Sequence, residues 1–400
     1  MGEAIIQASQ GELRRHWRAI VAGFVMAFFA WGSIFYAHGV FKAALEAKHG
    51  WSGVLISNAQ AWFWFVGAVS AYGAGWAVDR FGPRATACYG AYATAVGVFA
   101  VGQATEPWHL FLAYGLLATA YAPIGNLGIS AALAPLFNKR YGEALSYALT
   151  GASVGGAVVT PIFIYLTSAL GFGWATGLLA AVTLLCLTPV LRWAPTRAVQ
   201  PSDVDSVRID AIVRAALRTP TFWAIFVTGF FSFTGQVGFL MHEISIFMPR
   251  LGLEMAGYAV SVTVISAAFG RFVLGWAARK APLGLVAAGF YLIQATGFLI
   301  ANLGDGVAMA FVAAAVAGFV VGAVVMLPSM LIRAAFGGEG FGRMFGVASI
   351  GMFAGMTVGP GLAGIVASAA GYGTALWMFT GCLIAAAIVV IIGYRRRRDA

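Results

Sequence analysis

The segment GWAVDRFGPR, residues 75–84, interrupts two long apolar runs, and its first three residues recur as Gly275-Trp276-Ala277. Other residues recur at nearly the same offset of about 200 positions: Gly151 with Gly351, Gly155 with Gly355, Pro161 with Pro360, and Phe137 with Phe336. Chance can supply one or two such matches, but not the whole set at one offset. The chain therefore contains an internal repeat of two related halves.

The composition excludes a water-soluble globular protein. Hydrophobic residues make up 61% of the 400 residues and charged residues only 10%, with a mean hydropathy of +0.86. An ordinary soluble domain is about 25% charged, so we expect most of this surface to contact lipid. The 52 glycines agree with this expectation, because small residues let membrane helices approach closely.

Apolar runs of about 20 residues, long enough to cross a bilayer, are the structural unit of such a chain. Twelve are predicted, at 19–41, 53–78, 84–103, 108–134, 143–168, 172–193, 221–247, 256–278, 283–303, 306–332, 342–369 and 372–394. The first run is too long for a signal peptide, so we expect it to remain as a membrane helix. Each half holds six spans and inserts in the same orientation, which places the expected solute site between the halves near mid-membrane.

The predicted fold is an all-α integral membrane protein with twelve transmembrane helices in two six-helix, pseudo-symmetric bundles. The first bundle is predicted at 1–194 and the second at 219–400, joined by a polar cytoplasmic linker at 195–218. Within this linker, residues 207–217 are predicted to form a short amphipathic helix on the membrane surface.

Basic residues are unevenly distributed between the loops. With both termini in the cytoplasm, 20 Lys and Arg residues lie on that side, and only Lys42, Lys48 and Arg250 lie on the other. This asymmetry is the positive-inside pattern of multi-pass proteins. The arginines at 395–398 either anchor this topology or touch anionic headgroups. The net charge of +10 therefore implies no nucleic-acid partner, and we expect a protein of the cytoplasmic (inner) membrane with both termini cytoplasmic.

The charged segment 75–84 has two interpretations. As plain topology signals, Arg80 and Arg84 are explained, but Asp79 and the spacing of Gly75 and Gly82 are not. As a latch, the glycines permit a tight turn and close helix contact, while Asp79 and the arginines pair across helix ends on the cytoplasmic side. The second copy, at 275–280, has no aspartate, so the latch is predicted for the first copy only.

The segment resembles the signature of the major facilitator superfamily between its helices 2 and 3, glycine-x-x-x-aspartate-arginine-x-glycine-x-arginine. The resemblance implies the major facilitator fold and a role in cytoplasmic gating. On this sequence the gating residues would be Gly75, Asp79, Arg80, Gly82 and Arg84.

A narrower resemblance, to monocarboxylate porters and their bacterial oxalate/formate antiporter relatives, runs along the whole chain. The matching motifs are, in order, Gly50-Trp51-Ser52, the loop 137–142, His242, Gly270-Arg271, Phe336-Gly337, Phe341-Gly342 and Gly359-Pro360. The loop is similar to the family's aromatic-phenylalanine-x-x-arginine-arginine-glycine, although Leu136 and Tyr141 depart from it. The resemblance implies a secondary transporter of small organic anions.

Arg271 is the leading candidate for the substrate-binding residue. It lies well inside a predicted span, where an arginine costs at least about 2.5–3.5 kcal/mol on the lenient insertion scale. Its planar guanidinium matches a carboxylate with two parallel hydrogen bonds, and the resemblance implies that role. The alternatives are a side chain that extends to the cytoplasmic interface and a structural ion pair with Glu243.

Three further ionisable residues lie within spans. His242 and Glu243 are predicted near the far end of the seventh span. Both suit proton coupling, because a histidine can change charge near physiological pH and a carboxyl group can do so when burial raises its pKa. The alternative for Glu243 is solvation at the interface. His38 lies at nearly the same depth in the first span and is a candidate substrate-binding residue, or a stacked or water-contacting histidine.

Tyr36, Tyr121, Asn126 and Gln236 are polar or half-polar groups within predicted spans. Tyr121 precedes Pro123, which is expected to loosen the hydrogen bonding of the fourth helix, and the resemblance implies an aromatic wall of the substrate cavity there. Tyr36 and Asn126 are added as candidate substrate contacts. Asn126 and Gln236 can equally be hydrogen-bonding groups between helices.

The absence of a second intramembrane cation favours a monoanion. Oxalate-specific relatives carry a basic residue in the eleventh helix, whereas this sequence has no Lys or Arg between Arg343 and Arg395. We therefore expect proton-coupled transport of a monocarboxylate by alternating access. The alternatives are a drug-like or dicarboxylate solute on the same fold, and a non-transporting membrane sensor.

An enzyme is not expected, because the spans hold no paired carboxylates, metal-ligand spacing or nucleophile–base set. The three cysteines are far apart and lie in apolar segments, so neither a metal nor another cofactor is predicted. The expected partners are the monocarboxylate, the proton and the lipid bilayer, and the expected state is a monomer.

Overall fold

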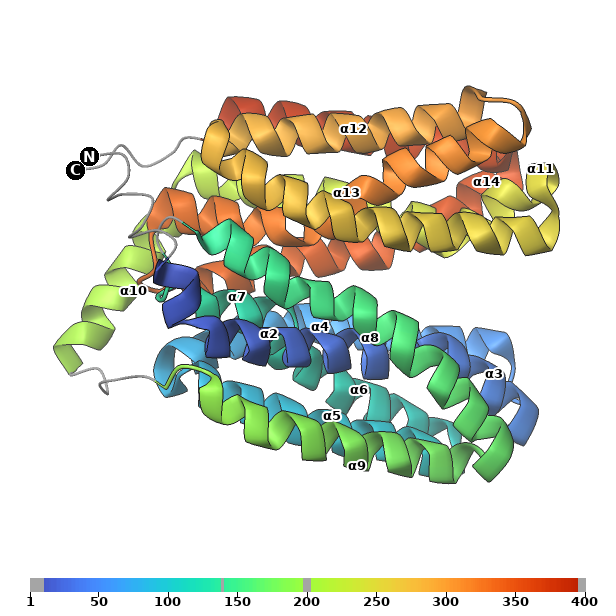
Figure 1. The fold of residues 1–400 in the computed structure, drawn as a ribbon, viewed down its shortest axis with the longest axis horizontal. Helices are drawn as coiled ribbons and strands as arrows, with labels where there is room; N and C mark the ends of the chain where they lie inside the picture. The colour runs from blue at the N-terminus through green and yellow to red at the C-terminus, as the bar shows by residue number, and fades with distance from the viewer. Residues whose placement is uncertain (1–10, 138–139, 197–202, 395–400) are drawn as a thin grey trace. The chain divides into compact units, whose positions relative to one another are not determined.

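The structure is a computed structural model that describes residues 11–137, 140–196 and 203–394, and its regular secondary structure in these ranges is entirely helical (Figure 1). Its helices are α2 (Trp17–Phe29), the π-helix η1 (Ala30–Phe35), α3 (Ala37–His49), α4 (Gly53–Phe81), α5 (Pro83–Gln103), α6 (Pro107–Ile124), α7 (Asn126–Leu133), α8 (Tyr141–Leu170), α9 (Phe172–Val190), the 3₁₀ helix η2 (Leu191–Trp193), α10 (Asp203–Leu217), α11 (Pro220–Lys280), α12 (Leu283–Leu303), α13 (Gly306–Phe336) and α14 (Phe341–Gly393).

The predicted helical membrane fold with about twelve spans is confirmed. Eleven helices of the described residues are long and apolar enough to cross a membrane when α11 is divided at Gly252 and α14 is taken as one. Both long helices contain a glycine with non-helical backbone angles, Gly252 with φ 73° and Gly371 with φ 81°. Each of these glycines separates two spans, so α14 supplies the eleventh and twelfth.

Local sequence signals begin several of the spans. The side chains of Ser52 and Thr219 accept hydrogen bonds from the backbone of Leu55 and Phe222, which caps α4 and α11. Proline occupies the first turn of α5, α6 and α11, where its missing N–H needs no partner. These boundaries lie within a few residues of the predicted ones.

The chain forms two compact units. The first comprises residues 1–210 together with 340–346, and the second comprises 211–339 together with 347–400. The start of α14 thus belongs to the first unit. The predicted division at 1–194, 195–218 and 219–400 stays a prediction. The helix α10 covers the predicted amphipathic segment 207–217, while Lys139, Arg197 and the arginines at 395–398 lie outside the described residues.

Repeated glycines mark close helix contacts in the first unit. Gly151 and Gly155, one turn apart on α8, face the backbone carbonyls of Phe24 and Phe28 on α2. A methyl group at either glycine would overlap those carbonyl oxygens. The two helices therefore pack through a small-residue stripe of the kind that stabilises helix pairs in membranes.

The second unit repeats this contact. Gly351 and Gly355 on α14 face the carbonyls of Phe226 and Phe230 on α11, in the same order and spacing. The offset of about 200 residues between the glycine pairs therefore has a structural cause, because both halves bring together their first and fifth spans through the same stripe.

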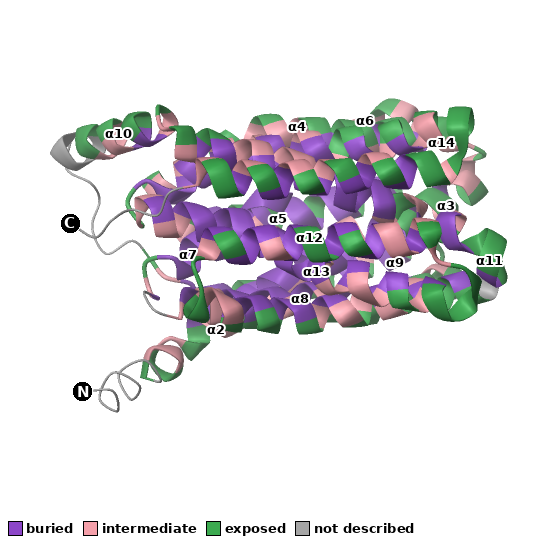
Figure 2. Ribbon diagram, turned by 90° about the horizontal axis from the view of Figure 1, so that it is seen from above, coloured by how far each residue is buried: buried purple, intermediate pink, exposed green. Residues whose placement is uncertain are grey.

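The outward faces of the spans are apolar. In Figure 2, exposed and buried positions alternate around single helices such as α12, so one face of each helix packs inward. Large apolar side chains occupy exposed positions, with Trp174 79%, Leu185 75% and Ile392 73% exposed. Surfaces of this kind suit hydrocarbon rather than water.

Candidate functional site

The loop between α4 and α5 contains the predicted gating segment. Gly82 has φ 87°, a left-handed conformation that favours glycine, and it ends α4 immediately before α5 begins. The Arg84 Nε atom donates to the carbonyl of Ala194 at 3.1 Å, and its Nη2 atom donates to the carbonyl of Arg192. Arg80 lies over the ring of Trp76, 5.2 Å from its centroid. The loop is thereby tied to the end of the sixth span.

Asp79 binds the first turn of α14. Its Oδ1 atom accepts from the backbone N–H of Gly342 at 3.0 Å, and its Oδ2 atom accepts from that of Arg343 at 2.9 Å. The first N–H groups of a helix lack partners in the helix and carry partial positive charge, so a carboxylate here is strongly favoured. Gly75, one turn before Asp79, makes room for this contact because a Cβ atom there would overlap the Gly342 carbonyl.

Arg343 extends this contact to α10. Its Nε atom lies 3.6 Å from Asp79 Oδ2, and its Nη1 atom donates to Asp210 Oδ1. In the sequence, Arg343 counts only among the basic residues of the cytoplasmic side, and Asp210 does not stand out. The one sequence feature that points to this helix start is the internal repeat, because Phe341-Gly342 follows Tyr141-Gly142 at the offset of the other repeated residues.

Arg271 is buried in the second unit, with only 6% of its surface exposed. The alternative in which it extends to the aqueous interface is therefore wrong. Gly270 packs against the carbonyl of Phe319 on α13, and Gly322 of the same helix faces the arginine side chain. A Cβ atom at Gly322 would lie 2.4 Å from the Ala267 carbonyl oxygen, 2.7 Å from Arg271 Cγ and 2.8 Å from Nε, so this glycine leaves room both for the backbone of the eighth span and for the arginine side chain.

Glu243 is buried rather than interfacial, with 1% of its surface exposed. Its Oε1 atom accepts a hydrogen bond from the hydroxyl of Thr263, which follows the bend of α11 at Gly252. The same hydroxyl lies 3.2 Å from the carbonyl oxygen of Ala314 on α13. Solvation at the interface is thus excluded for this carboxyl group, and Thr263 is a neighbour that the sequence analysis missed.

His242 joins α11 to α14 through both ring nitrogens. Its Nε2 atom lies 3.2 Å from the carbonyl oxygen of Pro360, and its Nδ1 atom lies 3.1 Å from the Tyr372 hydroxyl. A carbonyl oxygen only accepts, so Nε2 carries a proton and donates to it. In the neutral ring, Nδ1 then accepts from Tyr372, and in the charged ring it donates.

His38 lies in an aromatic box of the first unit and is 4% exposed. Its ring stacks on Tyr114 at 5.1 Å and meets the edge of Phe63 at 4.9 Å, and neither of its nitrogens has a hydrogen-bond partner. The ring is therefore stacked, as one of its interpretations expected. Its predicted part in substrate binding stays a prediction.

Tyr121 belongs to the same aromatic cluster. Its ring lies 5.6 Å from that of Trp31 in the π-helix η1 and 6.1 Å from that of Trp64 in α4. Tyr36 directly follows the π-helix and its ring lies against Gly156 of α8. The rings form a compact group from the first, second and fourth spans, and their role as a wall of the substrate cavity stays a prediction.

The fourth span is broken, as Pro123 suggested. It divides into α6 and α7 at Gly125, whose N–H donates to the carbonyl of Tyr121 at 2.7 Å. Asn126 begins α7, and its Oδ1 atom accepts from Ser130 at 3.1 Å, a bond within one helix. Discontinuous membrane helices commonly occur at the solute sites of transporters.

Gln236 has the interhelical role that was one of its two interpretations. It is 2% exposed, and its Oε1 atom accepts from Gln294 of α12 at 3.2 Å. The two amides join the seventh and ninth spans within the second unit.

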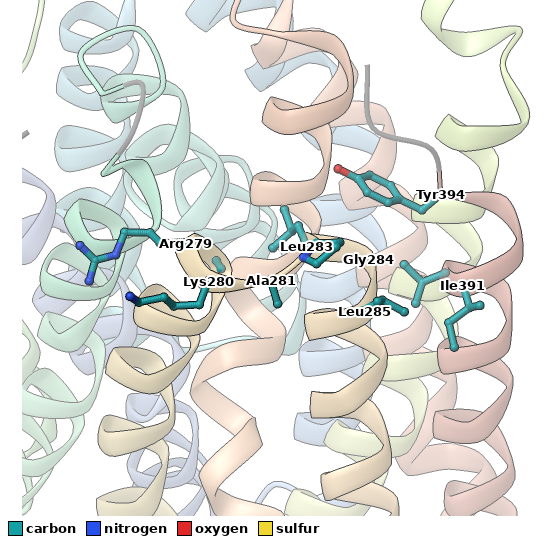
Figure 3. A pocket seen from close by; sticks show the side chains of 11 residues that line it. Arg279, Lys280, Ala281, Leu283, Gly284, Leu285, Ile391 and Tyr394 are labelled. Atoms are coloured by element: carbon teal, nitrogen blue, oxygen red, sulfur yellow. The ribbon is translucent and has the colours of Figure 1, made fainter. Parts of the chain in front are cut away.

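A cavity of about 510 Å³ lies in the second unit where α11 ends, α12 begins and α14 ends (Figure 3). Arg279, Lys280, Tyr394 and Ile391 are among its lining residues. In the picture, the two basic side chains extend to the side away from Tyr394 and Ile391. None of the predicted substrate-binding residues lines this cavity. The described residues contain no cluster of His, Cys, Asp and Glu suited to a metal ion.

Solved structures with the same architecture include the E. coli fucose:proton symporter FucP. One FucP structure matches with a TM-score of 0.74 and 14% identity, covering 94% of this chain and 98% of that one. A second, in the outward conformation, gives a TM-score of 0.77 at 15% identity with the same coverage. This likeness concerns the fold alone.

Curated relatives are distant and of several kinds. The MFS-type transporter dbaD of Emericella nidulans is 27% identical over 94% of this chain and 85% of its own length. Human monocarboxylate transporter 11 is 26% identical over 79% of this chain and 70% of its own length. The agnestins efflux protein AgnL12 of Paecilomyces divaricatus is 26% identical over 52% of this chain and 47% of its own length.

The sequence pattern of the Major Facilitator Superfamily matches residues 20–332, which is more than half of the chain. Together with the twelve-span architecture, this match establishes that the chain belongs to the major facilitator superfamily, whose members are secondary transporters and not enzymes.

Proposed function

We propose that the protein transports monocarboxylates together with protons, by alternating access. The observation that carries this proposal is the burial of Arg271, which is 6% exposed inside a membrane span. A buried guanidinium is costly in a membrane, and its fork of N–H groups binds a carboxylate with two parallel bonds. Gly322 of α13 lies against the Arg271 side chain and leaves room for it.

The number of buried cations supports a monoanion. No Lys or Arg occurs between Arg343 and Arg395, so the eleventh span supplies no partner for a second carboxylate. Human monocarboxylate transporter 11 and bovine monocarboxylate transporter 13 are among the relatives, which agrees with this class of substrate. We assign orientation of the substrate to Tyr121 and His242, and cytoplasmic gating to Asp79 with its neighbouring motif residues.

Proton coupling follows from the charge of the substrate. Moving one elementary charge through a potential of about 100 mV changes its free energy by about 2.3 kcal/mol. Carrying one proton with each monoanion removes this dependence on voltage. Glu243 and His242 are the proposed proton carriers, because both are ionisable and lie within the seventh span.

The proposed orientation in the membrane rests on the distribution of the basic residues. The 20 basic residues of one side place both termini in the cytoplasm under the positive-inside rule, in a cytoplasmic (inner) membrane. The proposed transporting state is a monomer.

Uptake into liposomes tests the proposal directly. Purified protein is supplied with a panel of radiolabelled acids, from acetate and lactate to benzoate and oxalate, with and without an inward proton gradient. We expect the gradient to accelerate monocarboxylate uptake, and a valinomycin-clamped potential to have little effect. A preference for oxalate over every monocarboxylate, or uptake that follows voltage and ignores the gradient, contradicts the proposal.

Export of lipophilic compounds is the second candidate. It is favoured by the relatives from fungi, one of which is named an efflux protein. The two candidates differ in charge, because Arg271 repels cations and attracts anions. The same liposomes loaded with a lipophilic cation distinguish them, since an exporter of such compounds releases the cation and a monocarboxylate transporter retains it.

A further inference from the structure

Glu243, Thr263 and Ala314 form a buried contact between three helical segments of the second unit. Glu243 lies before the bend of α11 at Gly252, Thr263 lies after it, and Ala314 lies on α13. The three residues are 1%, 1% and 0% exposed. The Thr263 hydroxyl is within hydrogen-bond distance of both Glu243 Oε1 and the Ala314 carbonyl.

The chemistry of a hydroxyl limits what this contact can do. A threonine hydroxyl has one hydrogen to donate and two lone pairs to accept with. An ionised carboxylate and a backbone carbonyl are both pure acceptors. Thr263 therefore cannot donate to Glu243 and to Ala314 at the same time.

Glu243, Thr263 and Ala314 can form hydrogen bonds in two arrangements, one for each protonation state of Glu243. When Glu243 is ionised, Thr263 donates to its carboxylate, and this charge-assisted bond stabilises the negative charge. When Glu243 is protonated, its own O–H donates to the Thr263 oxygen, and the threonine hydrogen turns to the Ala314 carbonyl. The atoms balance, because the only proton gained is the one on Glu243.

We propose that Thr263 is a positioning residue for proton coupling, a hydrogen-bond switch whose donor direction follows the protonation of Glu243. This inference rests on the proposed proton-coupled function and assigns a residue to it. Protonation adds a bond from α11 to α13 that is lost on ionisation. Loading a proton thus changes how the eighth span is attached to the tenth, the helix whose Gly322 packs against Ala267 and Arg271 of the eighth span.

Few other ionisable groups compete for this role. Those on the segments packed around Glu243 are His242, Arg250, Glu254, Tyr258, Arg271, Arg279 and Lys280 on α11, Tyr291 on α12, and Tyr372 and Cys382 on α14. Residues 306–332 of α13 include no ionisable side chain. His242 bonds to Tyr372 and Pro360, and Arg250 donates to the carbonyl of Ala301. Arg271 follows Thr263 by eight residues, a rise of about 12 Å along the helix.

Infrared difference spectroscopy of the purified protein during a pH titration tests the switch. The band of a protonated carboxyl group is assigned to Glu243 by its loss in Glu243→Gln. Thr263→Val removes the hydroxyl at constant shape, and we expect the pH midpoint of this band to rise by about one unit. This corresponds to proton binding that is about tenfold tighter, because the variant removes a stronger hydrogen bond from the ionised state than from the protonated one.

Two variants control this measurement. Thr263→Ser keeps a hydroxyl at the same position and is expected to keep the wild-type midpoint. Thr380→Val removes a buried hydroxyl that donates only to the Leu376 carbonyl of its own helix, and is expected to leave the midpoint unchanged. If Thr263→Val does not fold, Thr263→Ala provides the same comparison.

The outcomes separate this inference from the proposed function. The titration uses no substrate, so a midpoint that rises in Thr263→Val and not in Thr263→Ser supports the switch even if no carboxylate is transported. An unchanged midpoint in Thr263→Val overturns the switch, even if proton-driven monocarboxylate uptake is found. Equal shifts in the serine and valine variants also overturn it, because they would show a packing effect.

Discussion

The two units share a scaffold but differ in the polar groups that they bury. In the first unit, His38 sits among rings with neither nitrogen hydrogen-bonded. In the second, His242 at the corresponding depth uses both nitrogens, and it lies on the same helix as Glu243 and Arg271. The glycine stripes that join the first and fifth spans are the same in both units. Duplication therefore preserved the helix contacts, while the ionisable groups are concentrated in the second copy.

The guanidinium group in the second unit is tested by Arg271→Lys. A lysine keeps the charge but replaces the two-pronged fork with a single point of contact. We expect monocarboxylate uptake to fall about 100-fold, which matches the loss of one charge-assisted bond of about 2.7 kcal/mol. In the first unit, Tyr121→Phe is expected to lower monocarboxylate uptake less than tenfold.

The control for Arg271→Lys is Arg218→Lys, because Arg218 is an exposed residue between α10 and α11 and lies outside the predicted site. Both variants are compared by initial uptake rates per folded protein in liposomes. Near-normal uptake by Arg271→Lys would show that this residue does not bind the substrate, and the two units would then not differ in this function.

The packing that holds Arg271 is tested by Gly322→Ala. The added methyl group would lie 2.4 Å from the Ala267 carbonyl oxygen and 2.7 Å from Arg271 Cγ, so both the contact between the eighth and tenth spans and the arginine side chain must shift. Overpacking of this kind costs about 1–3 kcal/mol, so we expect uptake to fall about tenfold and thermal stability to drop. Gly289→Ala is the matched control, because its Cβ would meet no atom within 4 Å. Equal effects of the two changes would show that helix flexibility, and not Arg271, is responsible.

The contact of Asp79 with α14 is tested by Asp79→Asn. The amide keeps one acceptor oxygen but loses the negative charge that binds the helix start and Arg343. We expect a loss of about 1–2 kcal/mol in stability, measured as a lower midpoint of thermal unfolding in detergent. Asp210→Asn is expected to have a smaller effect of below about 1 kcal/mol, because the Asp210 side chain is 48% exposed. If Asp210→Asn lowered the stability more than Asp79→Asn, the contact of Arg343 with Asp210 on α10 would be the more important one.

The two histidines are compared by replacing each with phenylalanine. His38→Phe replaces a buried ring that makes no hydrogen bond, so we expect stability to change by less than about 0.5 kcal/mol or to improve. His242→Phe removes the partner of Tyr372 and should cost about 1–3 kcal/mol. Both are measured by thermal unfolding. If His38→Phe is the more damaging change, the aromatic box contains a contact beyond ring packing.

Most of the fold was predictable from local pattern. Membrane spans are long apolar runs, and their ends were marked by residues such as Ser52, Pro83 and Gly82. The broken fourth helix also followed from Pro123. The pairing of Gly151 with Gly351 predicted two equivalent helix contacts, because one packing geometry tolerates only small residues.

Of the residues in the candidate site, only the charged ones could be predicted from the sequence. Arg271 and Glu243 stand out because ionisable residues are rare in spans. Thr263 and Gly322 do not stand out, since threonine and glycine are common in membrane helices. Their importance follows from contacts with residues at distant positions in the chain.

By itself, the sequence determined that this chain is a multi-pass helical membrane protein with a duplicated architecture, because hydropathy and spacing are properties of the chain alone. Only the tertiary structure decided that Glu243 is buried against Thr263, that His38 is enclosed by rings and that Asp79 binds the start of α14. These facts depend on the direction in which a side chain points and on what a second helix places opposite it. Distances between residues far apart in the chain are set by packing, and no local pattern encodes them.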